Sequence, residues 1–132
     1  MPNIAAYAAK QMLDWQTGGA AATQPPTRWV ALSFGTPTSV SAMGEIQVNS
    51  GYSRQTGLFG AAASPAGSAS NTAAMTFGPF SSVQSIQGVV LYDTHTINSG
   101  NMLWYGTLSV ARTVQPGDQI VFTAGALIIT LS

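Results

Sequence analysis

The sequence contains no cysteine, and only 6% of its 132 residues are charged. The lack of cysteine excludes disulfide bridges, thiolate catalysis and cysteine-ligated metal sites. Ordinary soluble domains carry about 25% charged residues, so Ser, Thr, Gly, Ala, Asn and Gln must do most of the solvation here. The formal net charge is zero, which provides no electrostatic attraction to nucleic acid or to an anionic membrane. Such a composition suits a protein that is packed against neighbours.

Groups that catalyse reactions are also scarce. The one histidine, His95, lies two residues from Asp93. No G-x-S-x-G motif accompanies the pair, so we expect a hydrogen bond in a loop and not a catalytic triad. The acids are isolated along the chain, and one histidine without cysteine does not make a zinc site. We therefore predict no catalytic residues, no cofactor and no metal, and we expect that the protein is not an enzyme.

Long hydrophobic runs are missing as well. No run approaches the roughly 20 apolar residues that a membrane-spanning helix needs. The first fifteen residues have neither a basic segment nor a continuous apolar one. We therefore expect that they are not a secretory signal, and that the protein is made in the cytoplasm. A chain of 132 residues is expected to form a single domain, residues 1–132.

One helix is predicted, within residues 1–18. Asn3 is a suitable N-cap, residues 4–16 contain no glycine or proline, and Gly18 and Gly19 end the helix. Leu13 is predicted to point away from the larger apolar face, which is formed by Ile4, Tyr7, Ala8, Met12 and Trp15. Two compatible interpretations follow. The helix covers one end of a sheet, and Leu13 with its alanine neighbours contacts another subunit.

The rest of the chain is predicted to form a β-sandwich at residues 28–132, reached through a connector at residues 19–27. Short runs rich in β-forming residues recur between clusters of Gly, Pro and Asn. These runs cover residues 28–34, 45–48, 51–55, 73–77, 83–93, 102–108, 119–122 and 127–131. About eight short antiparallel strands with one N-terminal helix predict a mainly β fold, either jelly-roll or immunoglobulin-like.

Several features of these strands carry further expectations. Alternation in the first strand places Val30, Leu32 and Phe34 in the core. Gly88 predicts a β-bulge. The last run, residues 127–131, is expected inside a sheet, because a long apolar edge strand would aggregate. Residues 57–70 are rich in small side chains and are predicted to form a long surface loop.

Two sets of side chains suggest specific contacts. We expect Arg54, next but one to Tyr52, to form an ion pair with Glu45 and so pin adjacent strands. Five aromatic residues could stack on sugar rings, although large aromatics in a sandwich more often fill the core or an interface. They are Trp29, Tyr52, Tyr92, Trp104 and Tyr105.

Several segments, taken in order, resemble a known family. They are Leu13-Asp14, Trp29-Val-Ala-Leu, Gly35-Thr-Pro-Thr, Gly51-Tyr-Ser-Arg-Gln55, Leu103-Trp-Tyr-Gly-Thr-Leu and Ala124-Gly-Ala-Leu-Ile-Ile-Thr-Leu. The chain resembles, over essentially its whole length, a family of small tailed-bacteriophage virion proteins often labelled tail fibre protein. Members of similar design serve as capsid decoration, or cement, proteins.

The resemblance implies a decoration protein on the capsid surface, where a homo-oligomer would stabilise contacts between major capsid proteins. No nucleic-acid or membrane partner is expected. The contacts are expected from the helix and the small-residue loop, through Tyr7, Leu13, Trp15, Leu58 and Phe59. The alternative is a tail-fibre or baseplate component that touches a host glycan, although the chain has no long fibrous repeat and no coiled coil.

Overall fold

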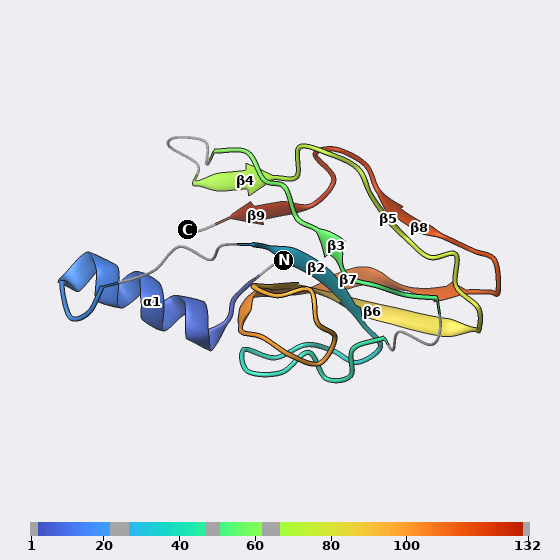
Figure 1. Ribbon diagram of the computed structural model, residues 1–132, viewed down its shortest axis with the longest axis horizontal. Helices are drawn as coiled ribbons and strands as arrows, with labels where there is room; N and C mark the ends of the chain where they lie inside the picture. Colours follow the sequence, from blue (N-terminus) through green and yellow to red (C-terminus); the bar gives the residue numbers. More distant parts are fainter. Residues whose placement is uncertain (1–2, 22–26, 47–50, 62–66, 131–132) are drawn as a thin grey trace.

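The computed structural model describes residues 3–21, 27–46, 51–61 and 67–130, which form nine strands and one helix (Figure 1). Every strand pairing in these residues is antiparallel. The elements are β1 (Asn3–Ile4), α1 (Ala6–Thr17), β2 (Trp29–Ser33), β3 (Gln55–Thr56), β4 (Ser68–Ser70), β5 (Met75–Phe77), β6 (Gln84–Tyr92), β7 (Met102–Val114), β8 (Ile120–Phe122) and β9 (Ile128–Thr130). The predicted mainly β, antiparallel fold with one N-terminal helix is confirmed.

The largest unit is a five-stranded sheet with the order β1-β7-β6-β2-β3. Its central strands are buried on both faces, which explains the nearly continuous apolar sequence of β2. On one face, Val30 and Leu32 join the main core cluster. On the other face, Ala31 and Tyr92 pack with Ala42 in a smaller cluster.

Two ribbons of two strands each, β4-β9 and β5-β8, complete the β structure. Figure 1 shows both ribbons on the same side of the sheet, so the domain has two layers. Between the layers lies the main core cluster, in which Phe77 from β5 contacts the rings of Tyr52 and Phe122 at centroid distances of 6.0 Å. The helix lies at one end of the sheet, and two long loops, residues 34–46 and 93–101, lie on the side of the sheet opposite the ribbons.

The predicted bulge at Gly88 is confirmed. The pairing of β6 with β7 shifts register between Ile86 and Gly88. A Cβ atom at Gly88 would lie 2.4 Å from the Pro37 ring and 2.5 Å from the Ser33 hydroxyl, so only glycine fits. Across this shift β6 has one residue where β7 has four, residues 108–111, and β7 therefore bulges as well.

Two predictions about single residues are wrong. Phe34 is not in the core, because its side chain is 49% exposed. Its ring lies on Gly44, where an added Cβ would come within 2.4 Å of it. Asn3 does not cap the helix, because it belongs to β1 and pairs with Tyr105. Ala5 takes the N-cap position without a side-chain hydrogen bond.

Several strand bounds also differ from the expectation. The last strand, β9, is not inside a sheet, since it pairs only with β4 in a ribbon. Part of the expected surface loop forms β4, whereas residues 62–66 lie outside the described residues. Of the run at 45–48, Glu45 makes an isolated bridge to Ser33, and residues 47–50 again lie outside the described part. β7 continues to Val114, well beyond the predicted end.

Candidate interaction surface

A buried ion pair supports the loop end of the sheet. Arg54 Nη2 lies 2.7 Å from Glu45 Oε1, and Arg54 Nε donates to Glu45 Oε2 at 2.7 Å. Both side chains are almost completely buried, at 0% and 1% exposure. The contact is bidentate, the strongest geometry for this type of pair. The predicted ion pair is confirmed.

Tyr52 extends this pair into the sheet. Its hydroxyl donates to Glu45 Oε2 at 2.8 Å and accepts the backbone N–H of Leu32 at 3.1 Å. Burial, followed by the nearby Glu45 charge, raises the pKa of the Tyr52 hydroxyl far above its ordinary value of 10.0. Tyr52 therefore stays protonated and can continue to donate to the carboxylate.

The same pair fixes the loop of residues 93–101. Arg54 Nη1 donates to the carbonyls of Thr94 at 2.7 Å and Ser99 at 3.1 Å, and Glu45 Oε1 accepts the backbone N–H of Asn98 at 3.0 Å. The Arg54 guanidinium also lies 3.7 Å from the centroid of the Tyr92 ring, a cation–π contact. No buried polar side-chain atom in the described residues lacks a hydrogen-bond partner. Two side chains thus hold the backbone of a loop that is remote in sequence.

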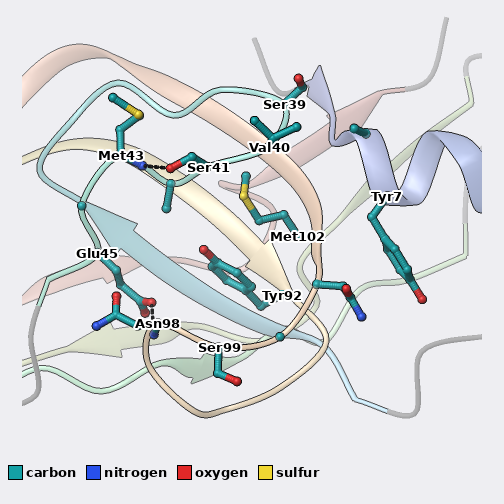
Figure 2. Close-up of a pocket in the computed structure, with 15 residues that line it drawn as sticks. Tyr7, Ser39, Val40, Ser41, Met43, Glu45, Tyr92, Asn98, Ser99 and Met102 are labelled. Atoms are coloured by element: carbon teal, nitrogen blue, oxygen red, sulfur yellow. Dashed lines mark hydrogen bonds between the residues drawn. The ribbon is translucent and has the colours of Figure 1, made fainter.

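An open cleft of about 420 Å³ lies between this loop and the loop of residues 34–46 (Figure 2). We call it the loop cleft. Hydroxyl and amide side chains are mixed in its lining with apolar ones, which include Val40, Met43 and Met102. Tyr92 stands in the middle of the view, and Tyr7 projects from the helix at one side. Burial, and then the charge of Glu45, raises the pKa of the Tyr92 hydroxyl, so this group is also protonated at neutral pH.

The lining of the loop cleft carries little net charge. Glu45 borders it, but both of its carboxylate oxygens are bonded to other groups of the protein. The remaining polar groups are hydroxyls and amides, which suit a neutral polar ligand or a polar protein surface. The described residues contain no group of three or more side chains that could hold a metal ion.

The predicted contact residues do not form one site. Tyr7 is 40% exposed and lines the loop cleft. Leu13 and Trp15 are 61% and 69% exposed, but on another part of α1. Leu58 is exposed near the ribbons, and Phe59 is partly buried against the main core.

The predicted apolar face of the helix is wrong for Trp15. Only Ala8 of α1 is buried, because the helix contacts the sheet over a small area, mainly along β7. Lys10 and Asp14 pair with each other at 2.6 Å on its surface. Two large apolar side chains are therefore left in solvent on a short helix.

The other expected contacts differ in detail. The Asp93 carboxylate bonds the backbone N–H and side-chain amide of Asn101, at 2.8 and 3.0 Å. His95 instead lies against the ring of Trp29, with 5.6 Å between centroids. Of the five aromatics considered for sugar stacking, Tyr52 and Tyr92 are buried and the other three are half-buried. They form no exposed planar set.

The sequence analysis missed the residues that shape the loop cleft. Val40 and Met43 are exposed in the first loop, and Asn98 and Ser99 come from the second. Neither loop contains a recognisable motif. The one usable signal was the Glu45–Arg54 pair, which was predicted only to pin adjacent strands but lies at the base of the second loop.

An antiparallel β domain with exposed apolar side chains and a weakly charged cleft has the features of a protein that works through contacts with other molecules. The chain belongs to the family described as podophage GP4 fiber I protein gp80, whose model matches residues 3–130. It is therefore a structural protein of the bacteriophage virion, in a family of fibre-type proteins, and the predicted resemblance is confirmed. No curated protein matches the chain. None of the helices in the described residues is long and apolar enough to cross a membrane.

Proposed function

We propose that the protein is a structural subunit of a phage fibre or of its attachment to the virion, and that it acts without catalysis. The observation that carries the proposal is the exposure of Leu13 and Trp15 on α1. The two side chains point to different sides of the helix, because residues two positions apart do not share a face. Each is a large apolar group exposed to solvent, and groups of this kind are typically buried at protein interfaces. The fibre description of the family agrees with this assignment.

The surroundings of these side chains favour burial against a neighbour. The charged groups next to them, Lys10 and Asp14, already neutralise each other. A partner would therefore displace water from apolar side chains without stripping an unpaired charge, which is the expensive part of interface formation. Trp is also among the residue types that most often dominate binding energies.

The test is virion incorporation of the Leu13→Ala/Trp15→Ala double variant, supplied in trans to a phage that lacks the gene. We expect at least a tenfold loss of the protein from purified particles, since truncating a central Trp anchor commonly costs about 2 kcal/mol or more. Val83→Ala is the matched control, because Val83 is exposed and lies far from the helix in sequence. Wild-type incorporation of the double variant would contradict the proposal.

A second candidate function, host-glycan contact, is favoured by the loop cleft. Its hydroxyl and amide lining and its two tyrosines resemble the mix of groups that bind neutral sugars. Ser99→Trp would fill the cleft, while Thr96→Trp in the same loop, outside its lining, is the control. Binding of the wild type and Thr96→Trp to a glycan array, with loss only in Ser99→Trp, would support this function. No binding by the wild type would exclude it.

Capsid decoration, the function first expected from the resemblance, differs from a fibre role in copy number. The family's description favours the fibre. Quantitative mass spectrometry of purified virions distinguishes the two locations, because only the capsid lattice repeats as often as the major capsid protein. A ratio near one to that protein would place the chain on the head, and a small fraction of it would place the chain on the tail.

A further inference from the structure

We propose that the opening between β7 and β8 is a self-association site, where β7 of one copy pairs antiparallel with β7 of a second copy. The opening, which we call the seam, is a cleft of about 630 Å³. Its lining includes Ile86, Leu108, Arg112, Asp118, Ile120 and Phe122. It lies away from the helix and the loop cleft, so the inference does not depend on the function proposed above.

The seam lies beside two strand edges without a partner. One edge of β7 pairs with β6, and the other pairs with β1 through Trp104 and Tyr105 alone. β8 pairs only with β5. Within the described residues, the outer edge of β7 from Gly106 to Val114 and the second edge of β8 therefore meet no strand. Unpaired edges bind extended polypeptide through main-chain hydrogen bonds.

Two features restrict what can pair with this edge. The bulge at residues 108–111 interrupts the regular part of β7, and Arg112 lies directly opposite Ile86. Directly opposed residues share a face of the sheet, so Arg112 is on the same face as the fully buried Ile86. A bulge and a charge on the core-facing side of an edge strand both discourage indiscriminate pairing. Arg112 is exposed, so pairing is favoured for a partner that brings a carboxylate to it.

A second copy of the chain brings that carboxylate. Arg112 is exposed and has no ion pair within the described residues, and Asp118 borders the same cleft. Asp118 is fixed in its turn by a 2.9 Å hydrogen bond from the backbone N–H of Gln115. A site that presents one cation and one anion is self-complementary about a two-fold axis. With four basic and four acidic residues in the whole chain, few other charges oppose the contact.

We place the two-fold axis at Thr113, the middle of the three regular residues between the bulge and the end of β7. A two-fold axis at Thr113 places Arg112 opposite Val114 of the second copy, at the end of β7 from which the turn with Asp118 departs. Arg112 of each copy would pair with Asp118 of the other, so the interface contains two such ion pairs.

The first experiment is a charge exchange, read by concentration-dependent native mass spectrometry of the purified full chain. We expect the wild type to dimerise and Arg112→Asp or Asp118→Arg to raise the dissociation constant at least tenfold, because each creates two like-charge contacts. Combining both changes should restore the dimer. Lys10→Asp, a charge reversal on the remote helix, should have no effect. A monomeric or trimeric wild type, or a double variant that remains monomeric, would overturn the proposal.

The second experiment uses the absence of native cysteine. Thr113→Cys introduces the only thiol in the chain, and an axis at this residue brings the two Cα atoms about 4.5–5.5 Å apart, within disulfide range. Mild oxidation should give a covalent dimer for Thr113→Cys and not for Thr96→Cys, an exposed loop position. Failure of Thr113→Cys to cross-link would rule out this register even if Arg112→Asp failed to fold.

Discussion

The two ends of the β structure differ in whether their charged side chains are buried and paired. At the loop end, Glu45 and Arg54 are buried and every hydrogen bond they need is supplied by the chain itself. At the seam, Arg112 and Asp118 are exposed and no ion pair joins them. In a chain with so few charges, one pair thus holds the domain together, while Arg112 and Asp118 stay exposed and are available for the contact proposed above.

The largest difference in stability between the two ends should appear when the arginine at each end is replaced. Arg54→Ala leaves the buried Glu45 carboxylate without its partner, and such a loss typically costs about 3–5 kcal/mol. We expect a reduction of that size in the free energy of unfolding, measured with urea. At protein concentrations at which the chain is monomeric, Arg112→Ala should leave the unfolding midpoint unchanged, and at higher concentrations it should weaken self-association. Equal effects of the two variants on stability would remove the distinction between the two ends.

A smaller effect is expected at the hydroxyl that joins the pair to the sheet. Tyr52→Phe leaves the buried N–H of Leu32 and one bonding site of Glu45 unsatisfied. Each group of this kind costs about 1–3 kcal/mol. The variant should remain folded but unfold at lower urea, and Tyr105→Phe is a control on a half-buried tyrosine. A loss below that of the control would mean that Tyr52 contributes only packing.

Alkaline pH should destabilise the fold through the loop end, because the two tyrosines with raised pKa values lie there. In the unfolded chain these hydroxyls ionise near pH 10, whereas burial keeps them protonated in the fold. The unfolded state therefore binds fewer protons above that pH, and stability falls as the pH rises. Urea titrations between pH 8 and pH 11 should show this fall, less steeply in Tyr52→Phe. A flat wild-type profile would contradict it.

The smallest effect is expected on the helix surface. Lys10 and Asp14 form an exposed pair one turn apart, and the hydrogen bond to Asp14 raises the pKa of Lys10. Solvent screens such pairs, which contribute little. Lys10→Ala should therefore leave the urea midpoint within experimental error of the wild type. A clear loss of stability would mean that α1 is held by more than its contact with the sheet.

Local sequence was sufficient to predict some of these features. β-forming runs located most strands, Gly88 indicated the bulge, and the residues near Tyr52 indicated the Glu45–Arg54 pair. These predictions succeeded because each depends on one residue's geometry or on charges that are scarce and must find each other.

The remaining features depend on contacts between distant segments. Nothing in the sequence after the turn at residues 115–118 reveals that β8 pairs with β5 and not with β7, the strand that precedes it. The same applies to Trp15, whose helical position matched an apolar face, but whose helix meets the sheet only over a small area. Partner choice by short strands is decided by the whole core, and so the seam and the loop cleft could not be foreseen.

The way in which Glu45 and Arg54 hold the loop of residues 93–101 has a consequence for variation between phages. Their bonds reach backbone atoms, the carbonyls of Thr94 and Ser99 and the N–H of Asn98. Side chains at Thr94 and Ser99 can therefore be exchanged without removing these bonds, whereas Asn98 has a φ of 61°, which favours Asn or Gly. Substitutions at this rim would change the surface of the loop cleft while the ion pair beneath it stays constant.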